Sequence, residues 1–281
     1  MLERREDEPV GTRGILKLPY DQRRIIVVTD KVPAVAATRR YGWREILGWV
    51  SPIIVPALTR MAVEAIIEAR TKMRQGGEEL VPVSWTDAKA LQFPVGHPRK
   101  NVVYIGHPVD PPAYIPVADF HRFLFEHKVA EAQRLIRSLG ALTVDVIRVE
   151  GWDQSAGVNL GFSTPASSGA SIDVGLSAGR GASTGRNILT TMKLKPTTPP
   201  HIPDGLVWFP HEPLWREVAE ARLESGLDAF VIDVRSTDDY GVNAGLKALV
   251  AKAGLEVGGS FVEHRNTVWR LQGTFSPAPA N

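Results

Sequence analysis

One pattern, present twice between residues 103 and 275, constrains the fold of this chain more than any other feature. Residues 114–116 and 120–122 (YIP and FHR) align without gaps on residues 208–210 and 214–216 (WFP and LWR). Matches that recur in the same order along a chain are the sequence signature of a repeated structural unit. We therefore predict an internal duplication.

Each copy continues in the same way after this start. Asp119 suits the N-cap of a helix that ends before Gly140, and Pro213 suits the first position of a helix that ends at Gly226. The matched segments that follow are 144–146 and 232–234 (VDV and IDV), 157–159 and 241–243 (GVN in both), and 186–188 and 265–267 (RNI and RNT). This order predicts a helix followed by three strands in each copy. Val242–Ala253 also fits a helix.

The predicted fold class is α+β, with two α-β-β-β repeats that form antiparallel sheets after an N-terminal segment with a long helix. Residues 1–102 would be the N-terminal segment, 103–196 the first repeat and 197–281 the second. The N-terminal segment holds a short apolar strand at Ile25–Val28 and a helical pattern from Trp43 to Met73, whose apolar residues suit a core or a membrane interface. The duplication could also reflect only two modules that pack around a pseudo-twofold axis, and such packing implies no activity.

The sequence contains no recognisable catalytic, metal or cofactor motif. It has no cysteine, which excludes disulfides, thiolate zinc sites and cysteine nucleophiles. His121 and His127 are too far apart for a metal-binding helical pair, while His97 and His107 each lie in a Gly-His-Pro tripeptide that a turn explains. Asp145 and Asp233 occupy equivalent positions in apolar strands, so we expect both on a solvent-exposed face. We predict a protein that is not an enzyme and has no metal, cofactor or small-molecule substrate.

The most unusual stretch is Gly151–Lys195, which contains eight glycines and only two acidic residues. Apolar residues occupy alternate positions in two parts of it: Val158, Leu160, Phe162, Ile172, Val174, Leu176 and Ala178. This alternation predicts strands with one apolar and one polar face. Membrane-spanning barrel strands need about ten such residues, and several subunits would have to contribute strands to close the sheet. A half-buried antiparallel sheet in a soluble protein has the same alternation.

Basic residues lie near the ends of this predicted hairpin, in a region without Asp or Glu: Arg180, Arg186, Lys193 and Lys195. They suit contact with an anionic membrane surface. Binding to nucleic acid is not expected, because the net charge is only +2 and the strip lacks the interleaved aromatic residues on which bases stack. The charged first residues and the short, proline-interrupted apolar stretch at Ile46–Leu58 indicate a protein that is cytoplasmic when soluble. The hairpin hypothesis adds that the protein is membrane-associated when active.

A helix that leads into glycine-rich amphipathic hairpins, twice along one chain, resembles the layout of the gasdermin and perforin-like pore-forming families over residues 117–275. The plain duplication departs from the gasdermin arrangement. The resemblance implies a non-enzymatic homo-oligomer that acts on membranes through Gly157–Lys195. The alternative is a soluble structural or interaction module that assembles through pseudo-symmetric edge strands.

Overall fold

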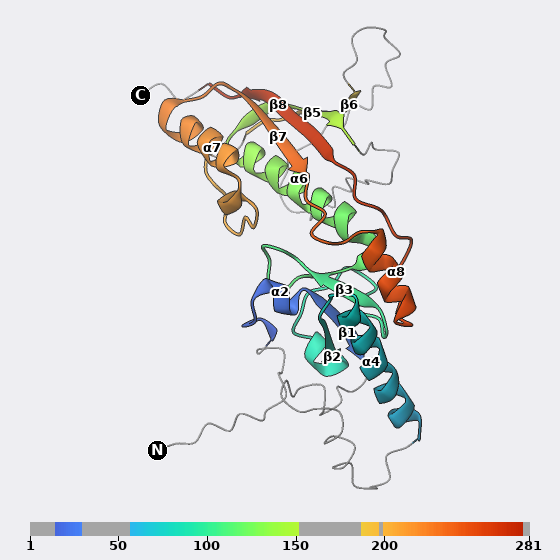
Figure 1. The fold of residues 1–281 in the computed structure, drawn as a ribbon. Coiled ribbons are helices and arrows are strands. Elements are labelled where there is room, and N and C mark those ends of the chain that lie inside the picture. Colours follow the sequence, from blue (N-terminus) through green and yellow to red (C-terminus); the bar gives the residue numbers. More distant parts are fainter. Residues whose placement is uncertain (1–14, 30–56, 152–186, 197–198, 278–281) are drawn as a thin grey trace, which may run out of the picture. The chain divides into compact units, whose positions relative to one another are not determined.

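The computed structural model describes residues 15–29, 57–151, 187–196 and 199–277 (Figure 1). It divides into two compact units, each built around a four-stranded sheet. Unit 1 comprises Met1–Phe120 and Gly241–Glu263, and unit 2 comprises His121–Tyr240 and His264–Asn281. The boundaries of these units differ from the predicted segments 1–102, 103–196 and 197–281, because residues 241–263 of the second copy belong to unit 1.

Unit 1 contains the sheet with strand order β2-β1-β3-β4. Its strands are β1 (Ile25–Thr29), β2 (Leu80–Ser84), β3 (Val103–Gly106) and β4 (Tyr114–Pro116). β1 pairs in parallel with β2 and antiparallel with β3. A parallel pair needs a long crossover, which includes α4 (Ala57–Gln75). The predicted strand at Ile25–Val28 and the long helix are confirmed within the described residues.

The core of unit 1 forms around β1, whose five residues are all buried. The surrounding elements are α2 (Tyr20–Arg23), α5 (Trp85–Ala88), η2 (Val117–Asp119) and α8 (Ala244–Lys252). One compact cluster consists of Ile15, Ile26, Val28, Val83, Ala88, Leu91, Val102, Tyr104 and Tyr114. Burial of these side chains is the main driving force for folding this unit.

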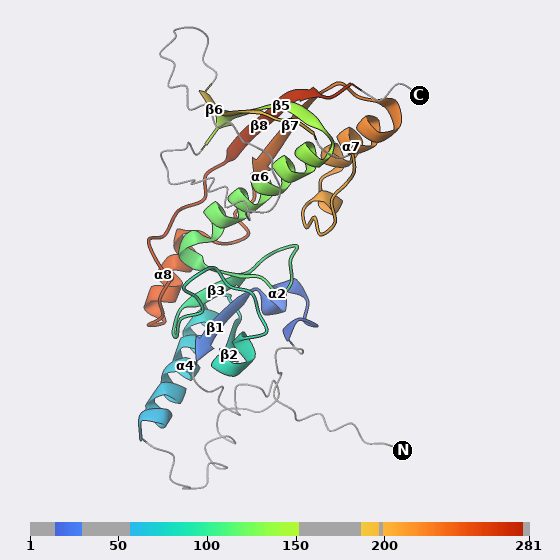
Figure 2. The ribbon, with the colours of Figure 1, turned by 180° about the vertical axis from the view of Figure 1, so that it is seen from behind.

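Unit 2 contains an antiparallel sheet with strand order β6-β5-β8-β7, and its helices α6 and α7 lie on one side of it (Figures 1 and 2). The elements are α6 (Phe120–Ser138), β5 (Ala141–Glu150), β6 (Asn187–Lys193), η4 (Phe209–His211), α7 (Pro213–Ser225), β7 (Ala229–Ser236) and β8 (Thr267–Phe275). Pro213 is the first residue of α7, and Gly226 ends it in the left-handed conformation with a φ of 69°. These predicted helix signals are confirmed.

The helix-facing side of the second sheet is apolar. Val144 and Val146 of β5 are buried, as are Ile232 and Val234 of β7. The intervening aspartates point the other way, which is the alternation expected of a strand with one buried face. On β8, Trp269 meets Phe125 of α6 edge to face, with ring centroids 5.1 Å apart. Aromatic contacts of this kind fix α6 against the sheet.

Both sequence copies form the same hairpin in the same register. The equivalent pairs are Val144↔Met192 and Ile232↔Leu271, then Asp145↔Thr191 and Asp233↔Arg270, then Val146↔Thr190 and Val234↔Trp269. The two hairpins join through β5 and β8 into one sheet, rather than forming a sheet each. The α+β class and the duplication are therefore confirmed. In the second copy α8 lies between the two strands, as the helical interpretation of Val242–Ala253 predicted, so the three strands predicted for this copy are two.

Candidate functional site: the base of the first hairpin and the outer face of its sheet

The predicted membrane hairpin lies mostly outside the described residues. This applies to Val158, Leu160, Phe162, Ile172, Val174, Leu176, Ala178, Arg180 and Arg186. The strands on either side of the segment are described. β5 and β6 pair antiparallel from Thr143↔Lys193 to Arg148↔Asn187, with a bulge between Val146 and Ile147. The glycine-rich segment therefore connects two strands that already form a hairpin stem.

Gly151 marks the point where this stem ends. Its φ is +85°, and a Cβ atom there would lie 2.4 Å from the Asn266 carbonyl oxygen and 2.3 Å from the Thr267 hydroxyl oxygen. Only glycine fits such a position, because both the backbone angle and the space exclude a side chain. The base of the segment is thus held against the start of β8.

Lys193 and Lys195, the two described members of the predicted basic set, are exposed. Lys193 is the last residue of β6, whereas the glycine-rich segment adjoins the first residue, Asn187. At about 3.3 Å per residue the two ends of this strand are about 20 Å apart. The structure therefore places these lysines at the end of the stem remote from the segment.

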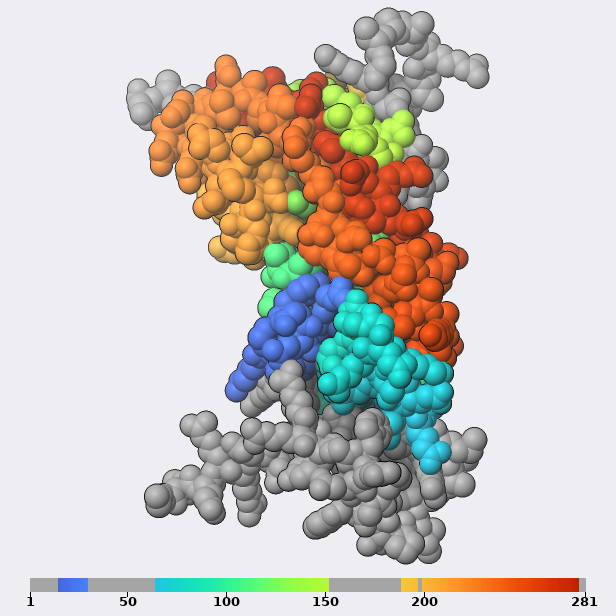
Figure 3. Space-filling model, in the orientation of Figure 1, coloured from blue at the N-terminus to red at the C-terminus, as the bar shows by residue number. Residues whose placement is uncertain are grey.

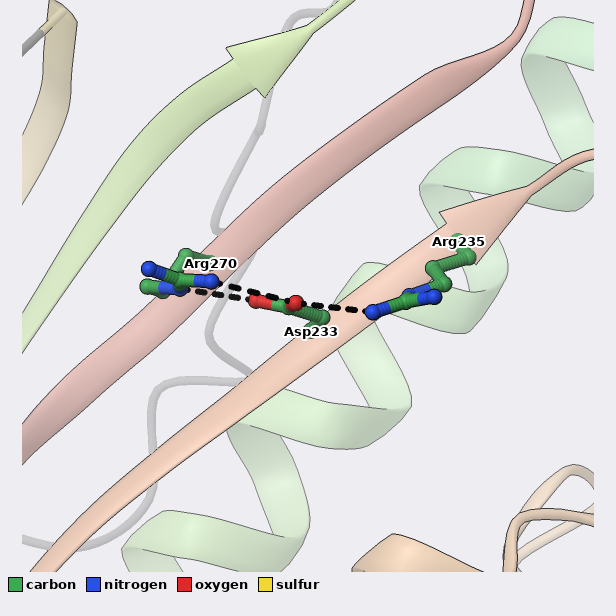
Figure 4. A network of polar contacts seen from close by, with 3 residues as sticks. All are labelled: Asp233, Arg235 and Arg270. Atoms are coloured by element: carbon green, nitrogen blue, oxygen red, sulfur yellow. Dashed lines mark hydrogen bonds and ion pairs between the residues drawn. The ribbon is translucent and has the colours of Figure 1, made fainter.

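Asp145 and Asp233 both lie on the outer face of the sheet, opposite α6 and α7, as predicted. Asp233 accepts two bonds from Arg270, at 2.8 Å to Oδ1 and 3.2 Å to Oδ2, and one from Arg235 at 3.1 Å (Figure 4). The hydrogen bond from Arg270 is the main cause that lowers the pKa of Asp233. Asp145 instead accepts a 2.8 Å bond from the Thr191 hydroxyl. The same position thus forms an ion pair in one copy and a hydrogen bond with an uncharged hydroxyl in the other.

Apolar side chains also reach the surface around this face. Ile188 of β6 is 54% exposed and Val231 of β7 is 59% exposed, and β7 belongs to the orange residues visible at the surface in Figure 3. Both belong to strands at the rims of the sheet. Isolated exposed apolar residues are common, but their position on both edge strands makes these edges candidate contact surfaces.

A small hollow of about 70 Å³ lies beside α6 and the end of β7. Its lining includes Lys128, Trp208 and Tyr240. The Lys128 ammonium is already engaged: it donates to the Arg235 carbonyl at 3.1 Å, forms an ion pair with Glu212 and lies 5.1 Å from the Trp208 ring centroid. Ligand pockets usually measure several hundred Å³. The hollow is therefore too small for a cofactor.

Two buried charged groups that the sequence analysis did not select hold unit 2 together. The Glu131 carboxylate accepts the amides of Val207, Trp208 and Phe209 at 2.7, 2.7 and 2.8 Å. Arg222 donates to the carbonyls of Leu139, Leu227 and Ser276 at 3.0, 2.9 and 2.8 Å, and burial lowers its pKa. Glu131 lies in the stretch EAQRL (residues 131–135) and Arg222 in EARL (residues 220–223), a similarity near the ends of the two helices that could have indicated both. Their partners are backbone groups, which points to a structural role.

The histidines have structural surroundings. His107 is buried, and its Nδ1 accepts the amides of Val109 and Asp110 at 3.3 and 3.0 Å, as expected for a turn. His97 Nδ1 lies 2.8 Å from the hydroxyl of Tyr104, whose pKa burial raises to about 12. Within the described ranges, no three His, Asp or Glu side chains come together as a metal site would require. Nor is any described helix both long and apolar enough to cross a bilayer.

Comparisons with protein-family models, curated proteins and solved structures give no significant match to this chain. Functional inference therefore depends on the hairpin stem, the outer face and the edges of the second sheet.

Proposed function

We propose that this protein is a non-enzymatic, oligomerising protein that acts on membranes through the glycine-rich segment Gly157–Lys195. The observation that carries the proposal is the antiparallel pairing of β6, which lies in the last part of this segment, with β5, which precedes it. An antiparallel stem brings both ends of a connection to the same place, which is the geometry that a hairpin requires. Its alternating apolar residues then supply a face suited to lipid.

The second copy provides an internal comparison. Its hairpin has the same register, but the connection between β7 and β8 contains α8, whose Leu246 and Val250 are buried. In the first copy the corresponding connection has period-two alternation and many glycines, which favour strands over a helix. The two copies thus differ most in the segments that connect their equivalent strands. This difference supports a specialised role for the first connection.

The charge of the stem suits an anionic surface. Lys193 and Lys195 are exposed, and residues 174–203 contain no Asp or Glu. A lysine close to an anionic membrane contributes about 1 kcal/mol to binding. Because these lysines lie at the far end of β6 from residues 157–186, we assign them to the approach of the protein to the surface, while the apolar residues enter the lipid.

Dye release from vesicles of phosphatidylcholine and phosphatidylglycerol tests the proposal. We expect wild-type protein to release dye and Val174→Asp to lose at least about tenfold of this activity, because a carboxylate on the lipid-facing side costs on the order of 1–3 kcal/mol. Ser177→Asp is the matched control, because it adds the same group to the polar side and should keep the activity. Inert wild-type protein, or equal activity of both variants, contradicts the proposal.

The alternative is a soluble assembly module. It is favoured by the two edge strands β6 and β7, whose exposed apolar residues suit contact with another subunit. This function predicts a stable oligomer that leaves vesicles intact. The dye-release measurement, together with the mass of the protein in solution, distinguishes the two functions.

A further inference from the structure

The duplicated hairpins leave two complementary strands at the rims of the second sheet. Inside the chain, β5, the first strand of the first copy, pairs with β8, the second strand of the second copy. The first strand of the second copy, β7, and the second strand of the first copy, β6, have no such partner strand and lie at opposite edges of the sheet. We propose that copies of this chain join head to tail, with β7 of one copy pairing with β6 of the next in the same way that β5 pairs with β8.

The strand directions permit this junction without any rearrangement. All three ladders of the second sheet are antiparallel, so the four strands alternate in direction from β6 to β7. A second copy placed beside the first in the same orientation would bring its β6 antiparallel to β7. Contacts between unlike surfaces of this kind generate rings or open filaments rather than closed dimers.

The internal junction also predicts the register between copies. Its pairs Thr143↔Thr274, Asp145↔Gln272 and Val146↔Leu271 become, at equivalent positions of the repeat, Val231↔Lys195, Asp233↔Lys193 and Val234↔Met192. In each of these pairs the first residue belongs to β7 of one copy and the second to the β6 strand, or the residues just after it, of the next copy.

The side chains at these positions are chemically complementary. Lys193, which is exposed, would lie opposite Asp233, a carboxylate on the outer face that Arg270 and Arg235 already bind. The methylene groups of Lys195 would cover Val231, which is 59% exposed in a single chain. On the helix-facing side, Met192 would extend the apolar row that Val234 begins. The apolar contacts of Val231 and Met192 therefore support this register.

One contact limits the length of the junction. Lys128 donates to the Arg235 carbonyl at 3.1 Å near the end of β7, so the pairing between copies would cover Val231–Val234, opposite Met192–Lys195 of the second copy. Four paired residues lie within the usual range of strand lengths. This junction rests on the oligomerisation in the proposed function. Its partner is a second copy of this chain, and its surface is formed by the edge strands β7 and β6.

The absence of cysteine makes disulfide crosslinking a direct test. The full chain carrying both Val231→Cys and Lys195→Cys is treated with a mild oxidant, alone and on phosphatidylcholine/phosphatidylglycerol vesicles, and run on a non-reducing gel. We expect a ladder of crosslinked dimers, trimers and larger species. Mixing chains that carry one cysteine each should give mixed dimers only.

The matched control combines Val231→Cys with Ile188→Cys. Ile188 is similarly exposed on β6 but lies far from Val231 in the proposed register. We expect at least about tenfold more crosslinked product from the 231/195 pair, because a disulfide forms only between Cα atoms within about 7 Å. Equal crosslinking of both pairs, or of Val231→Cys alone, overturns the proposed register.

The failure of this inference and that of the proposed function are distinguishable. Dye release by wild-type protein without crosslinking of the 231/195 pair overturns the head-to-tail junction and leaves the membrane function standing. A crosslinked ladder without dye release supports the junction and contradicts the membrane function. Wild-type protein that stays monomeric and inert on vesicles overturns both.

Discussion

Removal of the Glu131 carboxylate tests how unit 2 holds the segment that leads into its second helix. This side chain is 6% exposed, and its two oxygens accept three successive backbone amides. The amides precede and begin η4, just before α7. Replacement by alanine leaves these donors without their acceptor, while replacement by glutamine keeps one oxygen.

The cost follows from the burial of the three amides. A buried donor left without a partner costs on the order of 1–3 kcal/mol. The Trp208 amide is buried and the other two are partly buried, so about 2 kcal/mol for the first and about 1 kcal/mol for each of the others gives about 4 kcal/mol for Glu131→Ala. Glu131→Gln should cost about 1–2 kcal/mol, because its carbonyl oxygen can still serve Trp208 and Phe209.

Urea unfolding followed by circular dichroism measures these free energies. Glu217→Ala is the matched control, because Glu217 is an exposed acid on α7 and its loss should change stability by less than about 0.5 kcal/mol. The reasoning is refuted if Glu131→Ala stays within about 1 kcal/mol of wild type, or if glutamine proves as costly as alanine.

Two further predictions concern titration. Burial raises the pKa of Tyr104 to about 12, so a spectrophotometric titration of Tyr104→Phe should lose a tyrosine that ionises near this pH in the wild type. Since its pKa is raised in the fold, the stability linked to it is present below pH 10 and lost as pH rises through about 12. Arg270→Gln should raise the pKa of Asp233 in a carboxyl-detected NMR titration, and an unchanged value would contradict the assigned cause. Because the pKa of Asp233 is lowered in the fold, this pair stabilises the protein above the ordinary value of 3.8 and ceases to do so as pH falls below it.

Much of unit 2 could be predicted from local patterns. The signals at Pro213 and Gly226 limit α7 as expected, since helix ends depend on the residues at the ends themselves. The alternation around Asp145 and Asp233 correctly assigned the faces of two strands, because side chains of a strand alternate whatever it pairs with. The function of the glycine-rich segment stays a prediction, because only its stem belongs to the described residues.

By itself, the sequence determined the duplication, the α+β class and, in both copies, the helix with the strand that follows it. Only the tertiary structure decided that the two hairpins join through β5 and β8, that residues 241–263 belong to the other unit, and that Glu131 and Arg222 bind backbone groups far along the chain. The physical reason is range. Helix caps and strand faces follow from neighbouring residues, whereas strand partners and buried ion sites depend on which distant segments gain most by burying their surfaces together.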